Sequence, residues 1–584
     1  MPSDSISQPM AVDGIDSLRP LLMGTRHMAV AGHYGAAHAA FAILEAGGNA
    51  VDAGVAAGIA LGVLQSDLVN VAGVAPIMIY RARTRDVLTI SGLGTWPRAA
   101  TAEVVAKRFG GRIPVGLLRA IVPAAPEAWI TALEKFGTMS FADCAAAAIR
   151  FAIDGFPMYR LMSDMIELHV ADYRLWPSSA AIYLPGGRPP RVGELFFQTD
   201  LGRTLQYMVD EERAAAANGR VAGLRAARDA FYEGDIAHAI VAYHAANDGL
   251  LSRKDMADFR VDIEPPVRTR FAGVQLYACG PWCQGPVLPQ MLNVLAGIDL
   301  GAMGHNSLDY AHTVTEAIKL AFADREQYYG DPRFVNVPIE ALLSEAHAAA
   351  RRAMLRPNRA EPGMPPYGEI AGFAPSARQS PTTERASAGA HDTSYVAVVD
   401  KHGNVFSATP SDPSYDMPVI PGTGLAPSSR GSQSWADPAH ASAVAPGKRP
   451  RLTPSPALAI LADGSPMPFG TPGGDVQAQA MLQVFLNMTV FGMNPQQAVE
   501  APRFASYSFP DSFEPHAYSP GLLYVENRVP QDVREGLAAR GHQVVEWPAF
   551  VWRAGAVCVL HADARSGVIS AGADPRRPSY AVGW

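Results

Sequence analysis

The sequence has little cysteine and no surplus of basic residues. Four cysteines in 584 residues are too few for a disulfide framework in a chain of this length. Lysine and arginine number 48 against 55 aspartates and glutamates, which leaves a net charge of −7. Nucleic-acid binding requires a basic patch that this balance does not indicate. We therefore expect no nucleic-acid partner.

Export and membrane signals are also missing from the front of the sequence. Residues 1–18 are polar and acidic, and no cationic segment followed by an apolar run is present. The longest apolar run near the front, residues 53–64, is too short to span a bilayer. We expect residues 1–27 to be an N-terminal tail, residues 53–64 to be a buried helix, and the protein to be cytoplasmic with no membrane contact.

Few residues are spaced as metal ligands. Cys279 and Cys283 are close enough to form half of a metal site, but no second pair of cysteines or histidines has matching spacing. Packing explains these two cysteines better. No metal and no cofactor are predicted.

Apolar residues are abundant, at 48% of the chain against 18% charged residues. This composition is typical of a globular protein with a large core. The length allows three or four average domains or one large layered α/β unit, so the domain count stays open on length alone. Helical and strand-like patterns occur in both halves of the chain, which predicts a mixed α/β protein.

The stretch that organises the chain is residues 391–404, His-Asp-Thr-Ser-Tyr-Val-Ala-Val-Val-Asp-Lys-His-Gly-Asn. Apolar alternation after Thr393, a turn-forming segment and a second apolar run predict a β-hairpin that begins at Thr393. Cleavage of the Asp392–Thr393 bond would place the Thr393 hydroxyl beside its own α-amine, whose reference pKa is about 7.7 to 8.0. That amine can act as general base for the hydroxyl. From the local pattern alone, a turn or helix cap is the more common use of Asp-Thr-Ser.

Several segments resemble the gamma-glutamyltranspeptidase family. They are Leu-Glu-Ala-Gly-Gly-Asn-Ala-Val-Asp-Ala at 44–53, Ala-Asp-Arg at 323–325 and the hairpin turn at 398–404. The resemblance covers roughly residues 28–584. It implies a four-layer αββα N-terminal-nucleophile hydrolase fold and self-cleavage before Thr393. A large-subunit part, 28–392, and a small-subunit part, 393–584, would then form a heterodimer, with any higher oligomer left open.

The catalytic half of the family pattern is present. Ser411 stands where the family has a second threonine that orients the nucleophile. Asp412 follows it, either as a turn former or as a contact to the new amine. Gly473 and Gly474 match the family's Pro-Gly-Gly loop, whose backbone N–H groups bind the oxyanion. Glycine suits this role because the backbone must approach the tetrahedral intermediate without a Cβ in the way.

The γ-glutamyl clamp of the family is largely replaced. Leu93 stands where members carry an arginine that grips the substrate carboxylate, and nearby Arg98 is a weak substitute. The stretch 428–433, Ser-Ser-Arg-Gly-Ser-Gln, lacks the acidic residue that pairs with the substrate amine. Of the family's serine pair, one is Leu452 here and the other is Thr453. The substrate-binding candidates are Arg430, Arg451, Thr453, Asp475 and Gln477, with N-capping the alternative for Asp475.

These features predict an acyl-transfer enzyme acting on a small-molecule amide. The first hypothesis is a threonine amidohydrolase or acyltransferase of this family that cleaves a small carboxylate-bearing amide through an acyl-Thr393 ester. The second is a genuine γ-glutamyl transferase or glutathione hydrolase with a rearranged clamp. The third is a non-catalytic scaffold relative. Asp324 and Arg325, within the Ala-Asp-Arg motif, are expected to form a structural ion pair.

Overall fold

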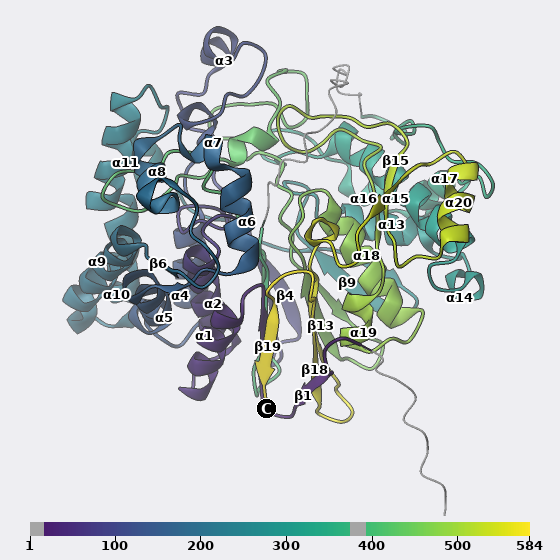
Figure 1. The fold of residues 1–584 in the computed structure, drawn as a ribbon, viewed down its shortest axis with the longest axis horizontal. Coiled ribbons are helices and arrows are strands. Elements are labelled where there is room, and N and C mark those ends of the chain that lie inside the picture. Colours follow the sequence, from purple (N-terminus) through teal and green to yellow (C-terminus); the bar gives the residue numbers. More distant parts are fainter. Residues whose placement is uncertain (1–16, 374–392) are drawn as a thin grey trace, which may run out of the picture.

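Two seven-stranded antiparallel sheets lie face to face at the centre of the molecule (Figure 1). The structure is a computed structural model, and it describes residues 17–373 and 393–584. In spatial order, the first sheet contains β1 (Leu22–Gly24), β18 (Ile569–Ala573), β17 (Cys558–Ala562), β13 (Pro466–Gly470), β12 (Ala457–Ile460), β9 (Val274–Ala278) and β8 (Val267–Phe271). The second contains β19 (Tyr580–Gly583), β2 (Met28–Ala31), β10 (Val396–Val399), β11 (Val405–Ala408), β3 (Ile77–Arg81), β4 (Asp86–Ile90) and β7 (Ile263–Glu264).

Helices from the first half of the chain lie on the outer side of the second sheet, at the left of Figure 1. α2 packs on β10 and β11, and every residue of α2 is buried, which confirms the buried helix predicted at 53–64. The helices of this half are α1 (Tyr34–Glu45), α2 (Ala50–Leu64), α3 (Ala102–Arg108), α4 (Ala125–Phe136), α5 (Phe141–Asp154), α6 (Arg160–Leu168), α7 (Val170–Tyr173), α8 (Pro177–Tyr183), α9 (Thr199–Ala215), α10 (Arg220–Tyr232), α11 (Asp235–Ala246) and α12 (Arg253–Ala257).

A second group of helices covers the first sheet, at the right of Figure 1. α13 packs on β8 and β9, and α18 packs on β13. The group contains α13 (Val287–Leu295), α14 (Leu300–Met303), α15 (Leu308–Tyr328), α16 (Ile339–Leu342), α17 (Glu345–Arg352), α18 (Val476–Thr489), α19 (Pro495–Glu500) and α20 (Gln531–Ala539). Two small sheets add β14 (Phe504–Ser506), β15 (Leu522–Glu526) and β16 (Gln543–Trp547), and β5 (Phe156–Pro157) with β6 (Leu195–Phe196).

β10 shows why the layers stack in this way. Val396 and Val398 belong to the core between the second sheet and its helices, whereas Ala397 and Val399 belong to the core between the two sheets. Because successive side chains of a strand point to opposite faces, a strand apolar at every position is buried on both faces. The order is therefore helix, sheet, sheet, helix, which confirms the layering that the family resemblance implies.

The β10–β11 hairpin is confirmed, and a single carboxylate organises its turn. Asp400 accepts from the backbone N–H groups of His402 at 2.8 Å and Asn404 at 3.0 Å. Its other oxygen accepts from the N–H of Ala50 at 3.0 Å, in the first turn of α2. The turn thus fixes the hairpin and ties it to the helix beneath it.

The predicted tail is shorter than residues 1–27. Residues 22–24 form β1, which pairs with β18, and Arg19 donates to the carbonyl of Ala573 at 3.3 Å. The backbone N–H and C=O groups of β18 need hydrogen-bond partners at the edge of the sheet. Residues 22–24 supply them, because a polar surrounding sequence does not prevent a short strand from forming. Residues 1–16 lie outside the described residues.

Candidate active site

Thr393 lies opposite Ser411, as the hairpin register requires. Val396 pairs with Ala408, and three further residues along each strand bring Thr393 and Ser411 into an antiparallel bridge. Their hydroxyl oxygens are 2.8 Å apart, which is hydrogen-bond distance for two hydroxyls. Both residues are buried. The structure therefore brings together the two hydroxyls that the sequence analysis selected.

Arg430 points at this pair of hydroxyls. Its Nη2 donates to Ser411 Oγ, and its Nε lies 3.5 Å from Asp412 Oδ1. The guanidinium also lies over the Phe513 ring, 5.1 Å from the ring centroid. The positive charge of Arg430 therefore contacts Ser411, and Ser411 in turn contacts Thr393.

The Gly473-Gly474 loop joins β13 to α18, the helix whose first turn contacts Thr393. Both glycines have positive φ, 122° and 56°, in the region that side chains disfavour. Within the described ranges 17–373 and 393–584, their N–H groups donate to no protein acceptor. Gln477, in the first turn of α18, donates from Nε2 to Thr393 Oγ1 at 3.4 Å. The loop therefore presents two backbone donors at the end of the helix that contacts Thr393.

The other substrate-binding candidates make protein contacts. Arg451 donates to Glu326 at 2.7 Å, and the Thr453 hydroxyl accepts from Gln433 at 2.8 Å. Asp475 caps no helix through its side chain; it pairs with Arg325 instead. Their substrate contacts remain predictions.

The predicted Asp324–Arg325 ion pair is wrong. Arg325 pairs with Glu326 at 2.6 Å and with Asp475, whereas Asp324 accepts from His347 at 2.8 Å. The Asp324 carboxylate faces α17, where Arg351 also lies 3.4 Å away, so it is paired without Arg325. The Arg325–Asp475 pair fixes the residue that follows Gly474.

Replacing Arg325 by methionine is expected to destabilise the protein by about 3 to 5 kcal/mol, because Asp475 stays buried without its cation. Thermal and denaturant unfolding measure this. Arg160→Met is the matched control, since the Arg160–Asp164 pair is exposed and its loss is expected to cost less than ~0.5 kcal/mol. Equal stability of the two variants would contradict an anchoring role for Arg325.

Arg98 does not take the place of the missing clamp arginine in this structure. Its guanidinium donates to Asp258 at 2.7 Å and is half exposed, whereas Leu93 is buried. Trp282, in the loop after β9, is buried and donates to Glu264 at 2.5 Å, so it serves packing.

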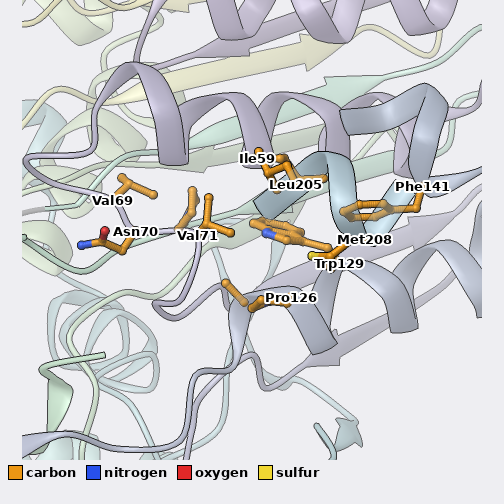
Figure 2. Close-up of a pocket in the computed structure, with 12 residues that line it drawn as sticks. Ile59, Val69, Asn70, Val71, Pro126, Trp129, Phe141, Leu205 and Met208 are labelled. Carbon is orange, nitrogen blue, oxygen red and sulfur yellow. The ribbon is translucent and has the colours of Figure 1, made fainter. Parts of the chain in front are cut away.

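Pro410, the residue before Ser411, lines a small and mainly apolar cavity. Figure 2 shows Trp129 at its centre among apolar side chains from several helices. Its volume of about 10 Å³ is room for at most one water, and an apolar lining favours a dry cavity.

A second cavity of about 10 Å³ is lined by Gln284, Ser455 and Gln477. A larger groove of about 570 Å³ is lined by Tyr328, Phe373 and residues of 438–448. Thr393 lines none of these three.

One buried group has the spacing of metal ligands. His312, Glu316 and His542 place their ligand atoms within 4.8 Å of one another. The imidazoles of His312 and His542 are hydrogen-bonded to each other at 2.9 Å, and Lys319 lies 2.5 Å from Glu316. Protein groups thus already contact the histidines and the carboxylate of this cluster.

Among the described helices, none is both long and apolar enough to cross a bilayer.

The chain is similar to known proteins over most of its length. The family model for gamma-glutamyltranspeptidase matches residues 36–584. The Acylase ACY 1 proenzyme of Pseudomonas sp. (strain SE83) is 33% identical over 90% of this chain and 88% of its own. The glutathione hydrolase proenzyme of Escherichia coli (strain K12) is 28% identical over 86% and 83%. The crystal structure of cephalosporin acylase from Bacillus halodurans superposes with a TM-score of 0.83 at 28% identity, covering 99% of both chains.

The fold and the site define an N-terminal-nucleophile hydrolase with four αββα layers. The match over nearly the whole chain assigns it further: it belongs to the gamma-glutamyltranspeptidase family.

The partners of the Asp412 carboxylate could not be predicted from the sequence. This carboxylate contacts Ser428 and Ser429, sixteen or more residues along the chain, and no motif connects these positions. The sequence also did not predict the Arg119–Asp416 ion pair, 3.0 Å apart, because these two residues are likewise far apart along the chain.

Proposed function

We propose that this protein is a self-processing amidohydrolase or acyltransferase with Thr393 as its nucleophile. The observation that carries the proposal is the 2.8 Å contact between Thr393 Oγ1 and Ser411 Oγ at the head of a central strand. The presence of proenzymes among its relatives supports self-cleavage. Cleavage would leave 28–392 and 393–584 as two chains of one folded unit. Asp392 itself lies outside the described residues.

Self-cleavage begins with attack of the Thr393 hydroxyl oxygen on the Asp392 carbonyl carbon. The hydroxyl proton passes to the Thr393 nitrogen as the C–N bond breaks, which leaves an ester between Asp392 and Thr393 Oγ1. Water then cleaves that ester, so that Asp392 gains a carboxylate and Thr393 regains its hydroxyl. The freed α-amine is the general base of the mature enzyme.

In turnover, the Thr393 hydroxyl attacks the amide carbonyl of a substrate, and the α-amine takes its proton. The Gly473 and Gly474 N–H groups stabilise the oxyanion, because preorganised donors favour the charge that develops in the transition state. The proton then passes to the leaving amine, and an acyl-Thr393 ester remains. Water or an acceptor amine takes the acyl group.

The proposed substrate is a small amide whose acyl group carries a carboxylate and no α-amine. Residues 428–433 contain no acidic side chain, and the Asp412 carboxylate already accepts from Ser428 at 2.6 Å and from Ser429 at 3.0 Å. An α-ammonium therefore has no evident partner. Arg430 places a positive charge one hydrogen bond from Thr393, through Ser411, and a guanidinium favours a carboxylate as its partner. The similarity to proteins named acylases supports this substrate class.

A matched set of three p-nitroanilides tests the substrate class. Glutaryl-p-nitroanilide is γ-glutamyl-p-nitroanilide without its α-amine, and butyryl-p-nitroanilide also lacks the carboxylate. We expect kcat/KM for the glutaryl compound to exceed the other two by about tenfold or more, equivalent to ~1.4 kcal/mol. A preference for the γ-glutamyl compound would favour the competing hypothesis.

That competing hypothesis is a true γ-glutamyl transferase or glutathione hydrolase with a rearranged clamp. Its support is the similarity to a glutathione hydrolase proenzyme. A scaffold role without catalysis predicts no hydrolysis of any of the three compounds, and the retained hydroxyl pair and glycine loop argue against it.

A further inference from the structure

Asp412 has an unusual backbone conformation next to Ser411. Its φ is 131°, outside the regions that residues other than glycine normally occupy. The surrounding loop holds it there: the Asp412 N–H donates to the Leu68 carbonyl at 3.1 Å, and the Asp412 carbonyl accepts from Asn70 Nδ2 at 2.9 Å. A Cβ on Gly73 would lie 2.9 Å from the Asp412 Cβ. A strained conformation this tightly fixed is typical of functional sites.

The strained backbone turns the Asp412 carboxylate toward the turn that precedes Arg430. One oxygen accepts from the Ser428 hydroxyl at 2.6 Å. The other accepts from the Ser429 N–H and the Ser429 hydroxyl, each at 3.0 Å. Asp412 is fully buried, so these hydrogen bonds face no competition from water. The carboxylate thus fixes the two residues before Arg430.

Arg430 extends from that turn back to the nucleophile. Its Nε lies 3.5 Å from Asp412 Oδ1, and its Nη2 donates to Ser411 Oγ. A guanidinium can only donate, so Ser411 Oγ accepts from Arg430. The same oxygen lies 2.8 Å from Thr393 Oγ1, so the position of Arg430 fixes the hydroxyl that Thr393 contacts.

We propose that Asp412 is a positioning residue for the nucleophile: it holds the 428–430 turn so that Arg430 keeps Ser411 Oγ at hydrogen-bond distance from Thr393. This inference rests on the proposed function, because it concerns the same nucleophile. Asp412 acts through Arg430 and Ser411 and does not itself touch the reacting atoms.

The charges around Asp412 give this role a pH dependence. Burial raises the pKa of Asp412 to about 6, while Arg430 opposes the rise. The other groups that face it are Asp416, whose pKa burial also raises, and Arg119, which is paired with Asp416. As the pH falls through about 6, the Asp412 carboxyl gains a proton, loses its attraction for Arg430 and no longer accepts at both oxygens. Arg430 is then no longer held against Ser411, and the contact between Ser411 and Thr393 is no longer fixed, so the reaction slows.

The rate of self-cleavage is the best measure of this role, because the uncut chain has no free α-amine at Thr393 to titrate in the same range. The chain is made by cell-free synthesis with a short radioactive pulse and transferred to buffers between about pH 5 and about pH 8. The fraction cut at 392/393 is then followed by gel. Wild type is expected to cut more slowly below about pH 6.

Asp412→Asn is expected to slow cutting about 10- to 100-fold, equivalent to ~1.5 to 3 kcal/mol for a charged hydrogen bond, and to lose the decline near pH 6. Asp416→Asn is the matched control: it removes a neighbouring buried carboxylate, and the decline should remain. Ser429→Ala, which removes one donor and no charge, should slow cutting by less and keep the decline. If Asp412→Asn does not fold, the slower cutting expected of Ser429→Ala is the result that tests the inference.

Three results would overturn the inference. Asp412→Asn could cut at the wild-type rate, the decline near pH 6 could persist in Asp412→Asn, or Asp416→Asn could abolish it. In each case wild type still cuts, and the proposed function stands. A wild-type chain that stays whole at every pH would overturn the proposed function together with the inference.

Discussion

Thr393→Ala is expected to remain a single chain of 584 residues that neither cuts itself nor hydrolyses an amide. The same hydroxyl serves both reactions in the proposed mechanism, and no neighbouring group replaces a nucleophile once it is removed. We expect turnover to fall by about 10⁴-fold or more, as for other catalytic nucleophiles. Intact-mass spectrometry of freshly purified and incubated protein measures the cut, and the glutaryl p-nitroanilide measures turnover.

Two control variants make the Thr393 result specific. Thr393→Ser keeps a hydroxyl at the same place and should cut itself, though more slowly. Ser394→Ala removes the adjacent hydroxyl, which is also buried, and should cut normally. If Thr393→Ala still yields fragments that join at 392/393, or if the wild-type protein stays whole after long incubation, another residue or no residue is the nucleophile.

Gly473→Ala is expected to lower both self-cleavage and turnover by about 10²- to 10³-fold, the loss that follows removal of one oxyanion donor. With φ at 122°, an alanine is strained there, and the loop relaxes by turning its N–H groups away from the reacting carbonyl. KM for the glutaryl compound should change much less than kcat, because the oxyanion exists only after attack.

Gly422→Ala is the matched control for the glycine loop. Gly422 also has positive φ, 75°, and a Cβ there meets open space. It carries the same kind of backbone strain on the surface, so its activity should match wild type while its stability falls by about 1 kcal/mol. Equal activity losses in both variants would assign the effect to strain in general and not to the oxyanion site.

The hairpin and the buried helix were predictable because their signals are local. β10 and β11 alternate around a turn whose Asp400 bonds residues two and four positions ahead, and α2 is apolar all around. The pairing of Thr393 with Ser411 then follows from strand register alone. The glycine loop was predictable for a different reason, since its letters match a known family.

The side-chain contacts of Arg325 with Asp475 and of Asp412 with Ser428 could not be predicted, because these partners are distant in sequence. Arg325 meets Asp475 150 positions away, and Asp412 reaches Ser428 across a loop without regular structure. Nothing in the local pattern of Ala-Asp-Arg distinguishes an internal pair from two separate ones. The β1 strand was missed because three residues carry too little periodicity to stand out from a polar segment.

The order of strands in the two sheets restricts how this protein can be made. β2, from the first part of the chain, lies between β19 and β10 from the last part, and β9 lies next to β12. Neither part on its own completes either sheet, so each would expose unpaired strand edges that favour aggregation. A single gene delivers both parts tethered at high effective concentration. We infer that two genes encoding 1–392 and 393–584 separately would yield little folded protein unless both chains emerge together.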